Sequence, residues 1–365
     1  MTIGIGGAGS KVAVKLDKAA TVVNVSQTEL NKIEDAGQRI LATVHSMHGQ
    51  FRGSRKNPEI GHDAYLSVRR ELLEDIRGNL VFSSTGGGTG NGISTGLLYD
   101  LAEAENIGPS DKTSFALILP YAALEPAEFV RNTIDFLAGP LSAAIDSGNT
   151  GNIMLFTNRL KFESRLPEDG FNGMMVNSLE VFLAIPGKND TLALLDGHID
   201  HEDFALYTSR PYFNHFTYFD YDPEAPFEDQ LTANSNPLLL APEAPIEARF
   251  LLEVPDKGDP TIFYDILQFF ADHNVAPVYS VVENPDLERP FVTVSLLYSR
   301  KPAELLDDFS RISEKHAQAK LTKSLEQHVA LPKLEVNMAA EAQREAKKQG
   351  TGDDVLSVLK RLGKL

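Results

Sequence analysis

The stretch S-S-T-G-G-G-T-G-N-G, Ser83–Gly92, contains five glycines in ten residues. It ends a short apolar run and leads into the helix-like segment I-S-T-G-L-L-Y-D-L. A glycine-rich turn between a strand and a helix leaves consecutive backbone amides bare, and such amides bind phosphate groups. We therefore interpret Gly86–Gly92 as an anion-binding loop in which Thr89 offers its hydroxyl to a phosphate oxygen.

A second glycine-rich turn lies at the start of the chain, where Gly4–Gly9 fits the pattern G-x-G-x-x-G. This pattern alone is not specific, because a turn that packs a strand on a helix has the same sequence. A dinucleotide site expects an acidic residue at the end of the second strand, but that strand ends at Val23–Ser26 and the first acid is Glu29. Neither loop contains the G-K-[ST] of a P-loop. The two loops together favour a polyphosphate site that is neither a dinucleotide site nor a P-loop. A Rossmann NAD-dependent oxidoreductase stays as the less favoured alternative.

The composition of the 365 residues is that of an ordinary globular protein, with 42% hydrophobic and 23% charged residues. The formal net charge of −17 argues against broad binding to nucleic acid or to anionic membranes. The absence of cysteine excludes disulfides, thiolate metal ligands and a cysteine nucleophile. No apolar run approaches 18 residues and no signal peptide opens the chain. We therefore expect a soluble, cytoplasmic protein without membrane insertion.

The N-terminal half alternates short apolar segments with segments of helical spacing. This alternation predicts an α/β fold in which a mostly parallel, Rossmann-like sheet is covered by helices on both faces. Met174–Ile185 is apolar on most sides, which predicts a central, buried helix. The predicted strands are Thr21–Val25, Leu80–Ser83, Ser114–Leu119 and Asn152–Phe156, and the predicted helices are Pro58–Arg77 and Ser94–Glu105.

A second globular region is predicted from about Ala244 onward. Its segments follow the order strand, helix, strand, strand, which is typical of a smaller α+β domain. Beyond Pro302 the chain has helical spacing and then becomes polar, which predicts a helical C-terminal extension. The predicted segments of the second region are the strand Ala248–Val254, the helix Pro260–His273 and the strands Ala276–Val282 and Pro290–Tyr298.

The sequence G-G-G-T-G-N-G resembles the highly specific signature of the tubulin/FtsZ superfamily, G-G-G-T-G-[ST]-G. The resemblance continues in order over roughly residues 3–300. I-G-I-G-G-A-G-S-K-V-A resembles the first phosphate loop of FtsZ, Val23–Ser26 lies where FtsZ has V-N-T-D, and Gly53–Gly61 resembles the loop that ends N-P-E-[IV]-G. Further matches are Leu119–Tyr121 with Glu125 to the ribose-side loop, Phe156–Leu160 to I-x-N-[DN]-K-L, and Asn234–Leu239 to S-S-P-L-L.

The resemblance implies a nucleotide domain that binds GTP or GDP. Mg²⁺ would be held mainly by phosphate oxygens and water, and no dedicated metal site is expected, because isolated histidines in polar loops are more often solvated. The family has an arginine four residues after the ribose-side glutamate, whereas Arg131 lies six residues after Glu125. Asn177 falls where the family places its guanine-reading asparagine. The implied nucleotide-binding residues are Gly6, Gly7, Ala8, Gly9, Ser10, Lys11, Asn24, Arg55, Asn57, Gly86, Gly87, Gly88, Thr89, Gly90, Asn91, Gly92, Glu125, Arg131, Asn158, Phe171 and Asn177.

Two acids lie about twenty residues after Asn177, where the family carries N-x-D-x-x-D. The family's loop at this place is inserted by one subunit into the nucleotide site of the next. The resemblance gives Asp200 and Asp203 the catalytic role, since a carboxylate can orient and polarise a water for in-line attack on the γ-phosphate. Acids at a helix start also serve as N-caps, so a structural role is the alternative. The resemblance also places His198 among the catalytic residues of this loop. It stands where the family has asparagine, which keeps a nonhydrolysing filament scaffold open.

The resemblance thus implies a GTPase that polymerises head to tail with copies of itself, with hydrolysis at the interface between subunits. The short nucleotide domain and the missing tail peptide of the type D-I-P-A-F-L-R resemble the divergent phage or plasmid tubulins, the PhuZ and TubZ types. Such a filament would position or segregate DNA or phage particles in the cytosol of a bacterium, an archaeon or a phage-infected host; a cell-division FtsZ-like protein is the alternative. The implied parts are a GTP-binding domain, 1–173; a central helix with its lead-in, 174–197; a loop and activation domain, 198–300; and a helical extension, 301–365.

The end of the chain has an apolar stripe at helical spacing, Val355, Leu356, Val358, Leu359 and Leu362. A helix with one apolar face packs on its own chain, on the next subunit or in the groove of a partner. The spacing does not choose among these surfaces. We expect residues 353–365 to contact an adaptor protein or the neighbouring subunit, with docking on the chain's own body as the alternative.

Overall fold

The computed structural model describes residues 2–44, 53–105, 107–240 and 244–299, together with eight residues between 311 and 322. The chain divides into two units, Met1–Ala317 and Gln318–Leu365, and the description below concerns the first. In the part of the chain that the structure describes, no helix is long and apolar enough to cross a membrane. The segment 353–365, expected to contact a partner, lies outside the described residues.

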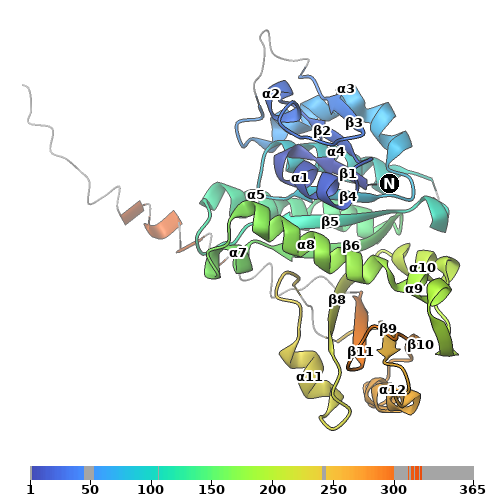
Figure 1. The fold of residues 1–365 in the computed structure, drawn as a ribbon. Helices are drawn as coiled ribbons and strands as arrows, with labels where there is room; N and C mark the ends of the chain where they lie inside the picture. Colours follow the sequence, from blue (N-terminus) through green and yellow to red (C-terminus); the bar gives the residue numbers. More distant parts are fainter. Residues whose placement is uncertain are drawn as a thin grey trace, which may run out of the picture. The chain divides into compact units, whose positions relative to one another are not determined.

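An eleven-stranded mixed sheet forms the centre of the first unit, in the order β3-β2-β1-β4-β5-β6-β8-β11-β9-β10-β7 (Figure 1). Its first six strands run parallel, as the alternation of strands and helices predicts. The four strands predicted in this half are confirmed. The sequence does not predict β3, because three of its four residues are exposed at the sheet edge. These strands are β1 (Thr2–Ile5), β2 (Thr21–Asn24), β3 (Gln38–Leu41), β4 (Leu80–Ser84), β5 (Thr113–Leu119) and β6 (Thr150–Thr157).

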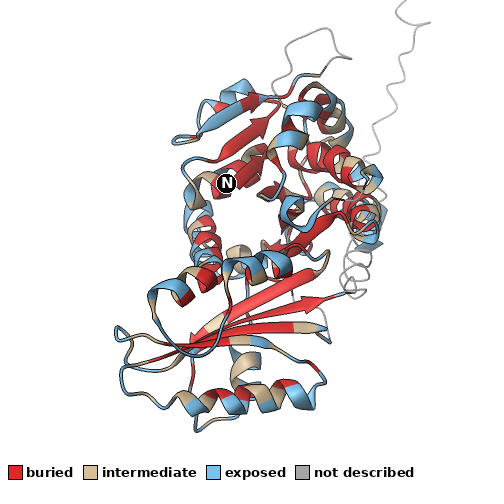
Figure 2. Cartoon of the chain, turned by 90° about the vertical axis from the view of Figure 1, so that its right-hand side faces the viewer, coloured by how far each residue is buried: buried red, intermediate tan, exposed pale blue. Residues whose placement is uncertain are grey.

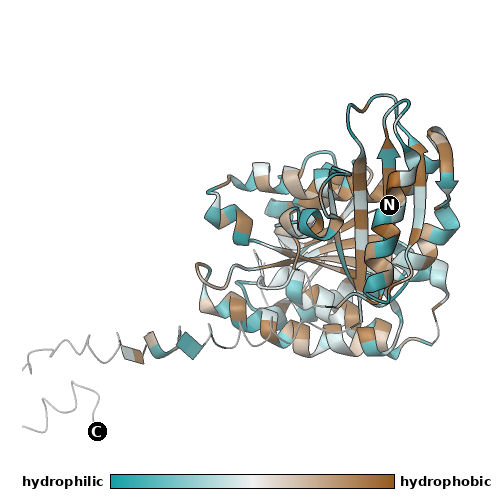
Figure 3. Cartoon of the chain, turned by 90° about the horizontal axis from the view of Figure 1, so that it is seen from below, coloured by the Kyte–Doolittle hydropathy of each residue, from teal (hydrophilic) through white to brown (hydrophobic). Residues whose placement is uncertain are grey.

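Helices cover both faces of the parallel strands, so alternate residues of one strand enter two different cores (Figure 2). Phe115 and Leu117 of β5 pack in a core with α3, α4, α5 and α6. Ala116 and Ile118 pack in the other core with α1 and α8. Seen from below, the central strands are largely hydrophobic while the helices carry hydrophilic residues outward (Figure 3). These helices are α1 (Gly6–Leu16), α2 (Gln27–Leu30), α3 (Pro58–Asp75), α4 (Thr89–Glu103), α5 (Ala127–Ala138), α6 (Pro140–Asp146), α7 (Arg159–Glu163) and α8 (Glu168–Leu183).

The helix α8 crosses the sheet from one end of the parallel strands to the other (Figure 1). It buries Phe171, Met175, Leu179 and Phe182 against the strands, as expected of a central helix. The helix begins at Glu168, six residues before the start predicted from the apolar pattern. It is followed directly by the short helix α9 (Ile185–Thr191).

The remaining five strands form the C-terminal half of the sheet. Within the sheet, β8 pairs in parallel with β6 at one registered residue pair, Ile153 and Phe213. The predicted order of strand, helix, strand, strand is confirmed in β9, α12, β10 and β11. The predicted domain boundaries stay predictions. The elements of this half are β7 (Ala193–Gly197), α10 (His201–Thr208), β8 (Phe213–Asp220), α11 (Phe227–Ala233), β9 (Glu247–Val254), α12 (Phe263–Asp272), β10 (Val278–Glu283) and β11 (Phe291–Tyr298).

Candidate functional site

Two helices begin side by side at the carboxyl ends of adjacent parallel strands. The helix α1 follows β1 at Gly6, and α4 follows β4 at Thr89. Neither N-cap residue, Ile5 or Gly88, caps its helix with a side chain. The first amides of both helices therefore have no side-chain acceptor, which is the arrangement that binds an anion.

The two glycine loops touch each other backbone to backbone. Gly6 has a φ of +71°, and a Cβ atom built on it would lie 2.9 Å from the backbone nitrogen of Gly90. A Cβ on Gly9 would lie 2.2 Å from the carbonyl oxygen of Phe82, on the neighbouring strand. Several glycines are thus required by the packing of the loops on each other and on the sheet, before any ligand is considered.

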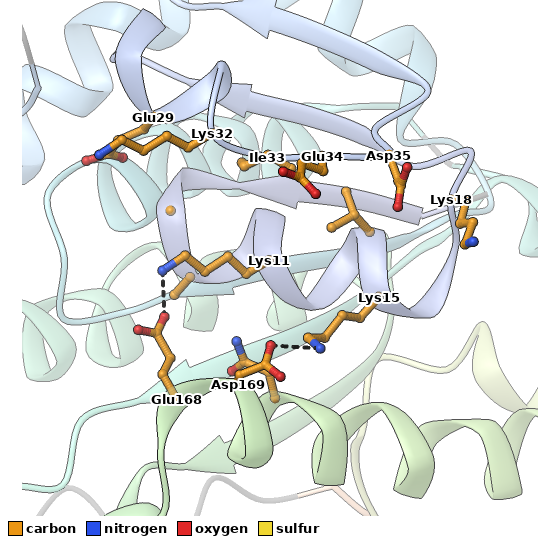
Figure 4. Close-up of a pocket in the computed structure, with 14 residues that line it drawn as sticks. Lys11, Lys15, Lys18, Glu29, Lys32, Ile33, Glu34, Asp35, Glu168 and Asp169 are labelled. Carbon is orange, nitrogen blue, oxygen red and sulfur yellow. Dashed lines mark hydrogen bonds and ion pairs between the residues drawn. The ribbon is translucent and has the colours of Figure 1, made fainter.

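Only some of the loop residues face open space. A cavity of about 230 Å³, here called the inner cavity, is lined by Gly86 and Gly87 of the second loop and by Ala8 of the first. A cavity of about 920 Å³, here called the outer cavity, is lined by Gly7, Ala8 and Lys11 along α1 (Figure 4). Both cavities are lined by Ala8, Glu168 and Asn172, so they adjoin at the start of α8.

The ribose-side residues predicted from the sequence meet in the inner cavity. The side-chain amide of Asn158 donates to Oε2 of Glu125 at 3.0 Å, and the backbone amide of Tyr121 donates to the same oxygen at 2.6 Å. Both Glu125 and Asn158 line the inner cavity. Arg131 is not with them, because it projects from α5 into a third cavity of about 570 Å³ that Arg55 also lines.

The start of α8 supplies an aromatic ring and an amide to the inner cavity. Phe171 and Asn172 are both buried and both line it. Asn177, the residue predicted to read the base, is exposed on the same helix and lines none of the three cavities described here. Sequence reasoning missed Asn172, although its position next to Phe171 at the start of an apolar helix was a usable signal.

Two ion pairs join α1 to the first turn of α8 beside the outer cavity (Figure 4). Nζ of Lys11 lies 2.8 Å from Oε1 of Glu168, and Nζ of Lys15 lies 2.8 Å from Oδ1 of Asp169. The side chains of Lys11 and Glu168 are about half exposed, at 51% and 50%. Such pairs contribute little to stability, so a ligand that enters the cavity can displace them.

The other residues predicted around the first loop are largely engaged within the chain. The fully buried Asn24 donates to Oε2 of Glu29 at 2.8 Å and accepts from the backbone amide of Ser26 at 3.1 Å. The hydroxyl of Ser10 donates to the carbonyl oxygen of Gly4 at 3.1 Å. Asn24 and Ser10 therefore shape the first loop, and Glu29 closes the side of the outer cavity next to Gly7.

The loop before α3 packs against the second glycine loop. Asn57 caps α3 by accepting from the amide of Glu59, and the hydroxyl of Thr89 donates to Oγ of Ser54 at 3.0 Å. Arg55 and Lys56 both have left-handed backbone, with φ of 51° and 63°. The side chain of Asn91 is buried and donates to the backbone of Thr85 and Asn132. The side chains of Thr89 and Asn91 thus hold the second glycine loop in place. Gly88 packs against the loop before α3, and Gly92 packs against the start of α3.

The predicted catalytic residues lie at the opposite end of the sheet. The helix α10 is held at the amino ends of β5 and β6, where Ser114 donates to Thr208 and Asn152 donates to Tyr207. Asp200 is the N-cap of α10 and accepts from the amide of Asp203 at 2.7 Å. His198 is exposed and Asp203 is half-buried. Within one chain the structure therefore does not bring Asp200 and Asp203 to the glycine loops, which follow the carboxyl ends of β1 and β4.

Metal-binding side chains do not gather in this part of the molecule. Among the residues that the structure describes, no group of three or more histidine and acidic residues is placed to hold a metal ion. His201, which the sequence places near His198, contacts the carboxylate of Asp190 at 3.1 Å instead.

Solved structures with this arrangement are known. A GTPγS-form protofilament of TubZ from Bacillus thuringiensis serovar israelensis has a TM-score of 0.71 and 12% sequence identity, with 90% of this chain and 94% of that chain covered. The chain has the tubulin/FtsZ fold. CetZ from Methanosaeta thermophila follows with a TM-score of 0.61, 16% identity and coverage of 94% and 98%, and an empty FtsZ dimer from M. jannaschii with 0.58, 17% identity and coverage of 82% and 88%. These structures confirm the fold expected from G-G-G-T-G-N-G, at identities too low to transfer an activity.

Comparison at the level of sequence gives no further guidance. No protein-family model matches the chain, and no curated protein matches it. The tubulin/FtsZ fold is thus visible in the geometry and in a few short motifs. The assignment of the individual site residues rests on where the structure places them.

Proposed function

We propose that the chain binds GTP and GDP at the two glycine loops and hydrolyses GTP between copies of itself in a filament. The observation that carries the proposal is the contact between Gly6 and Gly90, which sets two uncapped helix starts around one cavity. Two such starts offer more amides and more positive potential than a dinucleotide site with a single loop. A triphosphate is the ligand whose length and charge use both loops.

The cavity residues suggest how the rest of the nucleotide lies. Gly7, Gly86 and Gly87 leave their amides open to phosphate oxygens, and Glu125 with Asn158 offers acceptors and donors to a ribose. Phe171 offers a ring face to a purine, and the amide of Asn172 can hydrogen-bond the purine edge. We therefore assign base contact to Phe171 and Asn172, and we keep Asn177 only as the prediction of the motif.

Mg²⁺ would supply charge neutralisation for the β- and γ-phosphates in this site. The bare amides of both helix starts would share with Mg²⁺ the work of holding the phosphates. Lys11 and Arg55 are the cations predicted beside the phosphates, and Lys11 lines the outer cavity at its boundary with the inner one. Asp200 and Asp203 of a second copy would orient the attacking water at the site.

The separation of the two half-sites explains why assembly and hydrolysis would be coupled. The glycine loops lie at one end of the parallel strands, and Asp200 and Asp203 lie at the other. One chain therefore has both parts but cannot use them together. Head-to-tail stacking would place the α10 end of one copy on the cavity of the next.

The biological role that we propose is the placement of cargo by the filament. A filament of this kind would position or segregate phage or plasmid DNA or particles in the cytosol. The net charge of −17 makes direct, broad contact with nucleic acid unfavourable, so cargo would be held through an adaptor. The segment 353–365 is the proposed contact for that adaptor or for the neighbouring subunit.

One assay separates the proposal from its alternatives. Light scattering and phosphate release are followed together after addition of GTP and Mg²⁺, for the wild type and for Asp203→Ala. We expect the wild type to assemble and release phosphate, and the variant to assemble but hydrolyse at least tenfold more slowly. Assembly without phosphate release in the wild type would identify a scaffold instead, an outcome favoured by the use of Asp200 as a helix cap. Binding of NAD without any response to GTP would identify an oxidoreductase.

A further inference from the structure

A buried arginine lies under α10 with two guanidinium nitrogens that have no hydrogen-bond partner. Arg249 of β9 is 7% exposed, and neither Nε nor Nη1 of its guanidinium has a partner. The guanidinium carbon lies over the Tyr207 ring, 4.5 Å from its centre. Buried charged groups are nearly always paired, so this one requires a reason.

The charges around Arg249 come from three residues of the same end of the molecule. Burial lowers the pKa of Arg249, while the negative charges of Asp203 and Glu247 favour its charged form and Arg210 opposes it. Glu247 is already paired with Arg210 in an ion pair. The half-buried carboxylate of Asp203 has no hydrogen-bond partner among the described residues, although its backbone amide is bonded to Asp200. Asp203 lies four residues before Tyr207 on α10, on the same side of the helix as the ring that covers Arg249, so its charge is available to Arg249.

We propose that Arg249 is a positioning residue for Asp203. Its guanidinium, which lies over the ring of Tyr207, attracts the carboxylate of Asp203 and restricts the directions in which that carboxylate turns. Arg249 itself is only 7% exposed, and we assign it no contact with the nucleotide. The inference rests on the proposed function, because it concerns how one copy presents Asp203 to the phosphates held by the next.

The arrangement explains why an unfavourable group is retained. An arginine with free donors lowers stability, whereas a hydrophobic side chain of similar length would pack under α10 without any desolvation penalty. Functional sites are the places where proteins keep such unfavourable groups. A purely structural arginine would have its donors hydrogen-bonded, and its removal would lower stability. Removal of Arg249 should instead leave stability unchanged or raise it slightly.

The test compares Arg249→Met with Arg249→Lys, Asp203→Ala and the double variant Asp203→Ala/Arg249→Met. Melting temperature, critical concentration for assembly with GTP, and phosphate release per assembled subunit at saturating GTP are measured for each. Arg70→Met serves as the matched control, because Arg70 is an arginine with 93% of its side chain exposed.

We expect Arg249→Met to melt at the wild-type temperature or about 2 °C above it. Its turnover per assembled subunit should fall at least tenfold while the critical concentration changes less than threefold. Arg249→Lys should recover much of the turnover, since it restores the charge. The double variant should be no slower than Asp203→Ala alone, because Arg249 acts through Asp203. Arg70→Met should match the wild type in all three measurements.

Two results would overturn the inference. One is a melting temperature several degrees lower in Arg249→Met with turnover per assembled subunit unchanged, which would make the residue structural. The other is a double variant that is tenfold slower than Asp203→Ala, which would mean that Arg249 acts independently. A wild type that never releases phosphate from GTP would instead refute the proposed function. Phosphate release by the wild type therefore distinguishes failure of the proposed function from failure of the inference about Arg249.

Discussion

The backbones of Gly6 and Gly90 lie in contact, so that a Cβ on the first would be 2.9 Å from the amide nitrogen of the second. This contact joins the starts of two helices at glycines that are 84 residues apart in the sequence. It also explains why the chain needs two glycine loops rather than one. Each loop leaves room for the other, and together they border one cavity.

Replacing Gly6 by alanine should separate the loops. The alanine would need a φ of +71° and would also press on Gly90, which together should lower stability by about 2 kcal/mol. We expect binding of a fluorescent GTP analogue to weaken at least tenfold, measured by titration at a temperature where the variant is folded. Gly187→Ala is the control, because nothing lies within 4 Å of a Cβ there. Tight binding by Gly6→Ala would show that the loop contact is not needed.

Asp200 should have two separable roles. Its side chain caps α10, and loss of such a cap costs about 1 kcal/mol. Asp200→Ala should therefore lose both stability and phosphate release, whereas Asp200→Ser should keep the cap and lose only phosphate release. Urea unfolding and the GTP assay, run on both variants, check this. Full phosphate release in Asp200→Ser would leave the cap as the only function of this residue.

Lys188 and Glu253 should act as a pair. Nζ of Lys188 lies 2.5 Å from Oε1 of Glu253, which is 1% exposed, and Asn284 donates to the other carboxylate oxygen at 2.8 Å. Lys188→Met would leave a buried carboxylate without its cation, which should cost about 3 kcal/mol in urea unfolding. The double variant Lys188→Met/Glu253→Leu should recover most of this loss. If the single variant is as stable as the wild type, α9 is not fastened to β9 through this pair.

The stability of the fold should fall in mild acid because of His215. Burial lowers the pKa of this 3% exposed histidine from an ordinary value near 6.5 to about 4. The unfolded chain therefore takes up a proton below pH 6.5 that the folded chain refuses until pH 4. Stability is thus highest above pH 6.5 and falls by up to about 3 kcal/mol as the pH drops to 4.

The contribution of His215 is checked by difference. Urea unfolding at pH 7.0, 5.5 and 4.5 is compared between the wild type and His215→Asn, which cannot take up the proton. The wild type should lose more stability than the variant over this range, and the gap should be largest at the lowest pH. Parallel loss in both proteins would assign the acid sensitivity to other groups.

The sequence predicts the parallel half of the fold because its strands are buried on both faces and therefore contain apolar runs, as in Phe115–Leu119. It does not predict β8, where the polar residues Asn214, His215 and Thr217 are buried among aromatic ones and break any alternation. The early start of α8 was signalled by Pro167 and the acids that follow it, a usual helix beginning that the apolar pattern hides.

The candidate site divides in the same way. The glycine loops, Glu125 and Asn158 are predicted because their positions relative to the strands are fixed by short motifs. Asn172 is not predicted from the sequence, because the motif alone does not set the rotation of α8 about its axis, which depends on how Phe171 packs. Arg249 is not predicted either, since only the folded sheet shows that it is buried and that two of its nitrogens are unpaired. A role that requires a second copy of the chain, as proposed for Asp203, is beyond what one folded chain displays.

The helix α8 gives the molecule a direction. Its 16 residues span about 24 Å, from the glycine-loop end to the end that carries α10. In the proposed head-to-tail contact, two unlike surfaces pair. Each added copy covers one end of the row and presents the same kind of surface again at its own free end, so growth stops only if the row closes into a ring. An open row of copies would have two chemically distinct tips, one showing an unfilled cavity and the other a bare α10. Nucleotide exchange would then be possible at one tip alone.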